Sequence, residues 1–141
     1  MKKRPIVAVS GGFDPLHSGH INYILDASRY GDVIVILNSD AWLKRKKGYA
    51  FMPWDQRASI VGAIKGVIDV VPVDDSDGTV CDALRKIRPD YFAKGGDRGK
   101  DNTPEAELCG YLGVEMLYEI GGDKTESSSE LVRKVRGVQS S

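Results

Sequence analysis

Short apolar runs alternate along this chain with segments of helical character, and this alternation constrains the fold more than any other feature. Runs rich in β-branched or aromatic residues lie at 6–9, 33–37, 68–73, 91–93 and 114–118. The first two are continuously apolar, as expected of strands that are covered on both faces. Helices are expected at 20–30, 53–65, 80–87, 104–112 and 128–135. Strand and helix in turn predict an α/β fold, with a parallel sheet and helices on both faces.

The connections between the strands narrow the topology. Five parallel strands joined by right-handed crossovers favour a doubly wound, Rossmann-like sheet with the strand order 3-2-1-4-5. Ligands bind such a sheet at the C-terminal ends of its strands, where the first and fourth strands diverge. We expect all 141 residues to form one domain, with a core at about 5–136 and a frayed tail at 137–141.

Composition and charge disfavour several classes of partner. The chain has 20 basic and 20 acidic residues, whereas nucleic-acid-binding proteins usually carry a basic excess. No apolar stretch approaches the length of a signal peptide or a membrane span. Cys81 and Cys109 are far apart and form no metal-binding or disulfide pattern. We therefore expect a cytoplasmic protein that binds neither nucleic acid nor membranes.

The loop after the first strand has the features of a phosphate-binding site. It reads Gly11-Gly12-Phe13-Asp14-Pro15-Leu16-His17-Ser18-Gly19-His20 and leads into a helix. Paired glycines let a ligand approach the backbone, and the N–H groups at a helix start attract phosphate. Both histidines, the only two in the chain, could reach one bound phosphate. A zinc site is disfavoured, because zinc takes three or four ligands and the chain has no further histidine or paired cysteine.

Three later loops are also suited to phosphate. They are the basic run Lys44–Lys47 after the second strand, the stretch 94–98 (Lys-Gly-Gly-Asp-Arg) after the fourth, and the stretch 121–129 after the fifth. Taken alone, the basic run could be a solvated surface, and Asp97 could be a turn residue. The serines at 127–129 are suited to capping a helix whatever else they bind.

Together these stretches resemble the cytidylyltransferase-like nucleotidylyltransferase superfamily. Residues 12–20, which read Gly-Phe-Asp-x-x-His-x-Gly-His, match its HxGH signature, and the likeness extends over about residues 5–136. Within the superfamily, Asn38-Ser39-Asp40 and the stretch 94–97 look most like the nucleotidylyltransferase domain of ADP-heptose synthases. Glycerol-3-phosphate cytidylyltransferases come next. Those relatives usually carry arginine before the last serine or threonine cluster, where this chain has Lys124.

The resemblance implies an enzyme that transfers a nucleoside monophosphate to a phosphorylated sugar or polyol, such as a heptose 1-phosphate, and releases pyrophosphate. ATP is the favoured donor and CTP a close second. His17, His20 and Lys46 would be catalytic, and Mg²⁺ would bridge the phosphates, with no metal ligand assigned to the protein. A homodimer is the expected assembly. The residues expected to hold the nucleotide are Gly11, Gly12, Phe13, Asp14, Gly19, Lys44, Lys47, Arg57, Gly95, Gly96, Asp97, Lys124, Ser127, Ser128 and Ser129.

Two alternative functions stay open at this point. One is a cytidylyltransferase that acts on glycerol 3-phosphate or another alcohol phosphate. The other is a nucleotide-binding regulatory module without turnover, which the fold alone does not exclude. A dinucleotide-binding redox enzyme or a P-loop kinase is disfavoured, because the chain has neither Gly-x-Gly-x-x-Gly at its first turn nor Gly-Lys-Ser/Thr before a helix.

Overall fold

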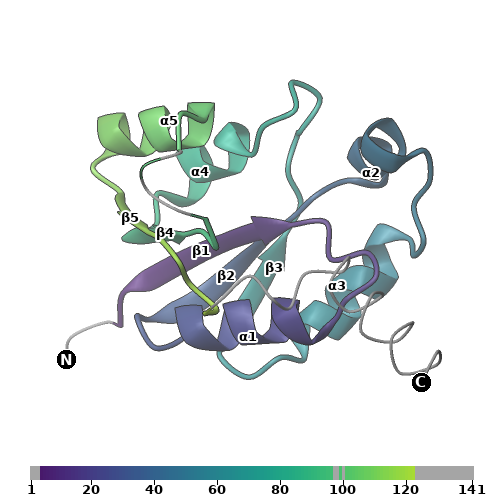
Figure 1. Ribbon diagram of the computed structural model, residues 1–141, viewed down its shortest axis with the longest axis horizontal. Helices are drawn as coiled ribbons and strands as arrows, with labels where there is room; N and C mark the ends of the chain where they lie inside the picture. Colours follow the sequence, from purple (N-terminus) through teal and green to yellow (C-terminus); the bar gives the residue numbers. More distant parts are fainter. Residues whose placement is uncertain (1–3, 97–98, 100, 123–141) are drawn as a thin grey trace, which may run out of the picture.

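A parallel sheet forms the centre of the molecule. The structure is a computed structural model that describes residues 4–96, 99 and 101–122. The described strands are β1 (Ile6–Gly11), β2 (Asp32–Leu37), β3 (Val67–Val71), β4 (Tyr91–Ala93) and β5 (Glu115–Leu117). They pair in parallel in the order β3-β2-β1-β4-β5 (Figure 1), which confirms the predicted topology.

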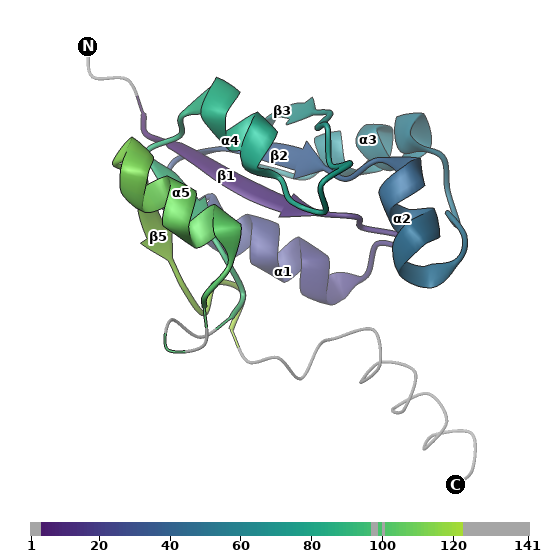
Figure 2. The same ribbon diagram turned by 90° about the horizontal axis from the view of Figure 1, so that it is seen from above.

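Helices cover both faces of this sheet. They are α1 (Ser18–Ala27), α2 (Asp40–Lys47), α3 (Trp54–Gly62), α4 (Cys81–Ile87) and α5 (Pro104–Leu112). The helices α1 and α3 lie on one face, and α4 and α5 lie on the other (Figures 1 and 2). The expected helix at 128–135 and the expected tail at 137–141 lie outside the described residues.

Successive residues of the central strand β1 serve opposite faces of the sheet. Val7 and Val9 pack with Ile24 of α1 and with α3, whereas Ala8 packs with α4 and α5. Both faces of β1 are buried, and Val7, Ala8 and Val9 have no exposed surface. This burial explains why the strand is continuously apolar rather than alternating.

The first helix begins earlier than the sequence pattern indicated. It begins at Ser18 rather than His20, with His17 as its N-cap, and it ends at Ala27. The His-Ser-Gly-His stretch is therefore the cap and the first turn of α1, not a loop before it.

The helix α2 forms at Asp40–Lys47, which is not among the helices predicted from the sequence. The Ser39 hydroxyl caps its start by accepting the Trp42 N–H, and Gly48 ends it in the left-handed conformation with φ of 89°. Both views place α2 beyond the C-terminal ends of β1 and β2 (Figures 1 and 2). It therefore lies at the edge of the sheet where ligands of doubly wound folds bind. Within the described part of the chain, no helix has the length and apolarity needed to cross a membrane.

Candidate active site

Two stacked imidazole rings lie at the N-terminus of α1. The rings of His17 and His20 are 3.8 Å apart between centroids and 25° from parallel. The Gly19 N–H donates to Nδ1 of His17, and the His17 N–H donates to Nδ1 of His20, each over 3.1 Å. These two bonds form a capping box in which histidines take the places usually filled by serine and glutamate.

The capping box determines which nitrogen carries the proton when each ring is neutral. Because each Nδ1 accepts a backbone N–H, each neutral ring carries its proton on Nε2. Burial, reinforced by the neighbouring His17, lowers the pKa of His20 to about 4. The pair is therefore suited to donating hydrogen bonds from Nε2–H at neutral pH, and His20 is poorly suited to carrying a positive charge.

Two residues that are expected to bind nucleotide also shape the loop beneath the histidines. Phe13 is buried in the core and meets the His20 ring edge to face, with the centroids 5.0 Å apart. Gly12 lies against α2, where an added Cβ would be only 2.7 Å from Leu43. The glycine pair is expected to let a ligand approach the backbone. At Gly12, the close neighbour in the structure is α2. Gly11 is the last residue of β1, and a Cβ there would meet the Phe13 ring at 3.1 Å.

Asp14 also contacts the protein rather than open space. Its buried carboxylate accepts the N–H groups of Phe51 and Met52 over 2.6 and 2.8 Å, and it pairs with Lys47 over 3.0 Å. Burial alone would raise the pKa of Asp14, but these hydrogen bonds and the lysine keep it below its ordinary value. Asp14 therefore joins the histidine loop to the end of α2 and to the segment that follows it.

The basic residues of α2 divide into two groups. Lys47 is directed inward to Asp14, and its ammonium also donates to the Asp14 carbonyl. Lys44 and Lys46 are exposed, and the Lys46 ammonium lies 4.6 Å from the centre of the Trp42 ring. Of the run 44–47, Lys44 and Lys46 are therefore better placed than Lys47 to meet a phosphate.

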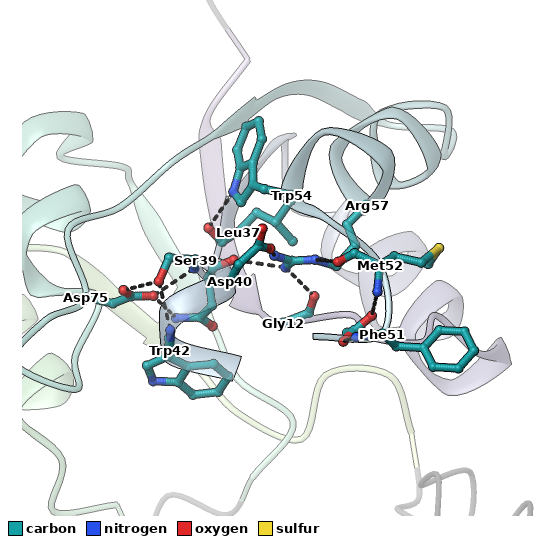
Figure 3. Close-up of polar contacts among 12 residues, drawn as sticks. Gly12, Leu37, Ser39, Asp40, Trp42, Phe51, Met52, Trp54, Arg57 and Asp75 are labelled. Carbon is teal, nitrogen blue, oxygen red and sulfur yellow. Dashed lines mark hydrogen bonds and ion pairs between the residues drawn. The ribbon is translucent and has the colours of Figure 1, made fainter. Parts of the chain in front are cut away.

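Arg57, which is expected to bind nucleotide, has a buried side chain bonded to the loops around the site. Its side chain has no exposed surface. The guanidinium donates to the carbonyls of Gly12, Asn38 and Met52 over 2.9 to 3.0 Å and pairs with Asp40 over 2.5 Å (Figure 3). The loops after β1 and β2 thus meet on this one side chain, which holds them together instead of presenting its charge to a ligand.

Asp75, a buried residue near the site, was not among the predicted site residues. Its carboxylate is bonded to Asn38 and Ser39 at the start of α2. Burial alone would raise the pKa of Asp75, but the Ser39 hydroxyl and the Asn38 amide lower it below its ordinary value.

The sequence does contain a local signal for the helix α2. Ser39 and Gly48 have the spacing of an N-cap and a C-cap.

The loops after β4 and β5 also contact the helix α1. The Tyr23 hydroxyl donates to the carbonyl of Ala93 at the end of β4, and the Gly121 N–H donates to the Asp26 carboxylate over 2.7 Å. Gly95 and Gly96 follow β4 after Lys94 and are half-buried. The glycine loop after β4 and the start of the loop after β5 therefore lie close to the helix that carries the histidines.

The lysine before these glycines is neutralised by a buried carboxylate. Lys94 pairs with Asp101 over 3.1 Å, and Asp101 also accepts the hydroxyl groups of Thr103 and Tyr118. These contacts order the described part of the loop between β4 and α5.

Five of the expected nucleotide-binding residues lie outside the described residues: Asp97, Lys124, Ser127, Ser128 and Ser129. Among the residues that the structure does describe, no three or more His, Cys, Asp or Glu side chains gather as metal ligands would.

Comparison with known proteins places this site in a family. The family model described as cytidylyltransferase-like matches residues 8–134. The chain belongs to the cytidylyltransferase-like family. The match confirms the resemblance that the histidine motif indicated.

The curated relatives are longer proteins. The chain is 41% identical over 141 residues to the bifunctional protein HldE of Campylobacter concisus and 34% identical over 138 residues to that of Pseudomonas syringae pv. tomato. These alignments cover 97% and 96% of this chain, but 28% of each relative. The chain thus spans less than a third of the length of these two relatives.

A solved structure shares the fold. It is the lipopolysaccharide core biosynthesis protein from Thermoplasma volcanium GSS1, with a TM-score of 0.68 and 22% sequence identity. The match covers 82% of this chain and 95% of the other.

Proposed function

We propose that this chain transfers a nucleoside monophosphate from ATP, or next from CTP, to the phosphate of a sugar or polyol such as a heptose 1-phosphate, and releases pyrophosphate. The family match and the likeness to HldE support nucleotidyl transfer to a sugar phosphate. The observation that carries the proposal is the stacked histidine pair at the N-cap of α1, with both Nδ1 atoms bonded to backbone N–H groups.

The proposed reaction is a single in-line displacement. An oxygen of the acceptor phosphate forms a bond to the α-phosphorus of the nucleotide. The bond from that phosphorus to the oxygen bridging the α- and β-phosphates breaks, and the electron pair leaves with pyrophosphate. The attacking phosphate is already ionised at neutral pH, so the protein needs no general base, and catalysis consists of positioning and charge stabilisation.

The histidines would stabilise the charge that develops on the phosphate oxygens. Each neutral ring carries its proton on Nε2 and is fixed by its bond at Nδ1. Donors that are already oriented need no rearrangement during the reaction, which is why they lower the barrier. The exposed ammonium groups of Lys44 and Lys46 would add positive charge from α2.

We propose that Mg²⁺ enters with the nucleotide and is bound mainly by its phosphates. Mg²⁺ prefers oxygen ligands and often keeps those of substrate phosphates. Asp14, Asp40 and Asp75 lie at the loops after β1 and β2, and all three are engaged by protein donors. Phosphate and water oxygens would then supply the coordination, and the metal would supply charge neutralisation.

A substrate panel tests this function. Pyrophosphate release is measured with Mg²⁺ while ATP and CTP are offered separately against heptose 1-phosphates, other sugar phosphates and glycerol 3-phosphate. We expect release with ATP and a sugar phosphate. Preference for CTP with glycerol 3-phosphate would replace the proposed substrates. Nucleotide binding without release across the panel would contradict the proposal and favour a regulatory module.

A further inference from the structure

The basic helix α2 is held only weakly by apolar packing. Of its eight residues, all of them described, Leu43 alone is buried, and four are lysine or arginine. Helices in proteins are normally held by an apolar face packed on the core. The orientation of α2 must therefore depend strongly on polar contacts at its ends.

Asp75 supplies these contacts at the start of the helix. One carboxylate oxygen accepts the Ser39 hydroxyl over 2.6 Å. The other accepts the Asn38 side-chain amide over 3.0 Å and the Ser39 N–H over 2.9 Å. Asp75 is only 3% exposed, so these bonds form in a region of low dielectric, where they are strong and costly to break. Figure 3 shows the Asp75 carboxylate facing Ser39 beside the first turn of α2.

Ser39 connects Asp75 to the first turn of α2. Its hydroxyl proton is donated to Asp75, which leaves an oxygen lone pair to accept the Trp42 N–H over 3.0 Å. The Asp75 carbonyl also accepts the Arg45 guanidinium over 2.8 Å. Asp75 thus restrains both the N-cap of α2 and a side chain from its last turn, on either side of Lys44.

We propose that Asp75 is a positioning residue, which acts through Ser39 to orient α2 so that Lys46, which lies over the Trp42 ring beside Gly12, meets the phosphates of the nucleotide. The inference rests on the proposed function for its substrate. Asp75 itself contacts no reacting atom, and its effect belongs to nucleotide binding rather than to the chemical step.

Asp75→Asn tests the proposal with little change in side-chain volume. The amide has one acceptor oxygen in place of two. It therefore either loses the bonds from the Asn38 amide and the Ser39 N–H, or it can meet the Ser39 hydroxyl only as a donor. We expect the KM for nucleotide to rise by about tenfold while kcat changes little, because an unsatisfied buried group costs enough to shift α2. Asp74→Asn is the matched control, since Asp74 is exposed and its carboxylate accepts hydrogen bonds from Ser76 in its own turn; its KM should stay at the wild-type value.

A second pair of variants checks the route through Ser39. Ser39→Ala removes the hydroxyl and should raise the nucleotide KM as Asp75→Asn does. Ser39→Thr keeps the hydroxyl and should have the wild-type KM. If Asp75→Asn does not fold, the two Ser39 variants still test whether Ser39 orients α2. A Ser39→Ala variant with wild-type KM would contradict the proposal, as would a fall in kcat alone in Asp75→Asn.

The same comparison can be made by calorimetric binding of ATP or CTP. If the wild-type chain is inactive across the substrate panel, the proposed function fails. The dissociation constants of the four variants still decide whether Asp75 positions α2. Equal nucleotide affinity in wild type and Asp75→Asn would overturn the inference.

Discussion

At the scale of single residues, the histidine pair illustrates how backbone geometry determines side-chain chemistry. Each Nδ1 is occupied by a backbone N–H from the same turn. A proton on either Nδ1 would remove an acceptor from the capping box and leave a backbone N–H without its partner. The first turn of α1 and the hydrogen-bonding role of its histidines therefore depend on the same two bonds.

The depressed pKa of His20 predicts a dependence of stability on pH. The pKa of His20 is about 4 in the folded chain against an ordinary value of 6.5. Between these two values the unfolded chain binds a proton that the folded chain does not, so stability falls as pH falls through this window. The free energy of unfolding in urea at pH 7 and pH 5 should decrease more for wild type than for His20→Gln. An equal decrease in both proteins would contradict the assignment.

Arg57 gives a prediction about stability rather than about ligand binding. Arg57→Met should lower the free energy of unfolding by about 3–5 kcal/mol, because it leaves several buried carbonyl groups and Asp40 without their donor. Arg57→Lys should rescue little of this loss, since an ammonium cannot reproduce the planar fork. Arg85→Met, at an exposed position of α4, is the control in the same urea experiment. A loss below about 1 kcal/mol for Arg57→Met would mean that the loops are held by other contacts.

At the scale of secondary-structure elements, the strands and four of the described helices were predictable, and α2 was not. Strands with both faces buried leave continuous apolar runs, and β1 and β2 are of this kind. A helix with one buried side chain leaves no apolar period, so only the caps Ser39 and Gly48 indicated α2. The roles of Asp14, Arg57 and Asp75 were equally hidden, since each depends on a partner more than 15 residues away in the sequence.

Two glycine-to-alanine substitutions, one at the C-cap of α2 and one inside α5, should change stability in opposite directions. Gly48 is in the left-handed conformation, where an added Cβ would meet no other atom. Gly48→Ala should therefore cost only backbone strain, about 1 kcal/mol of stability. Gly110 lies in α5, also with open space around its Cβ position, and Gly110→Ala should stabilise by about 0.5–1 kcal/mol. Thermal unfolding measures both, and a stabilising Gly48→Ala would contradict the assignment of this cap.

At the scale of the whole molecule, the sheet order explains why the site forms from distant segments. With β1 and β4 adjacent, the loop after β1, the helix α2 and the glycine loop after β4 lie at the same edge of the sheet.

The packing between the sheet and the helices α4 and α5 gives a prediction about stability. Phe92 of β4 is buried on the face covered by these two helices. Phe92→Ala should therefore cost about 3–5 kcal/mol of stability. Tyr111→Ala, at a position that is 85% exposed, should cost little in the same unfolding experiment; similar losses would contradict the packing described.

The assembly expected from the family resemblance is a homodimer, and sedimentation measures it directly. We expect a sedimentation equilibrium mass near twice the chain mass of 15.4 kDa. A mass equal to that of one chain over the whole concentration range would contradict this prediction.

In the proposed mechanism, the two histidines at the cap of α1 stabilise nucleotidyl transfer. The most direct test of this role is the kcat for pyrophosphate release by His17→Ala and His20→Ala, with nucleotide affinity measured separately by calorimetry. We predict that each substitution lowers kcat by about 10²–10³-fold, as loss of an oriented donor does, with a much smaller change in nucleotide affinity. Wild-type kcat in both variants would show that the histidine pair is not the catalytic centre.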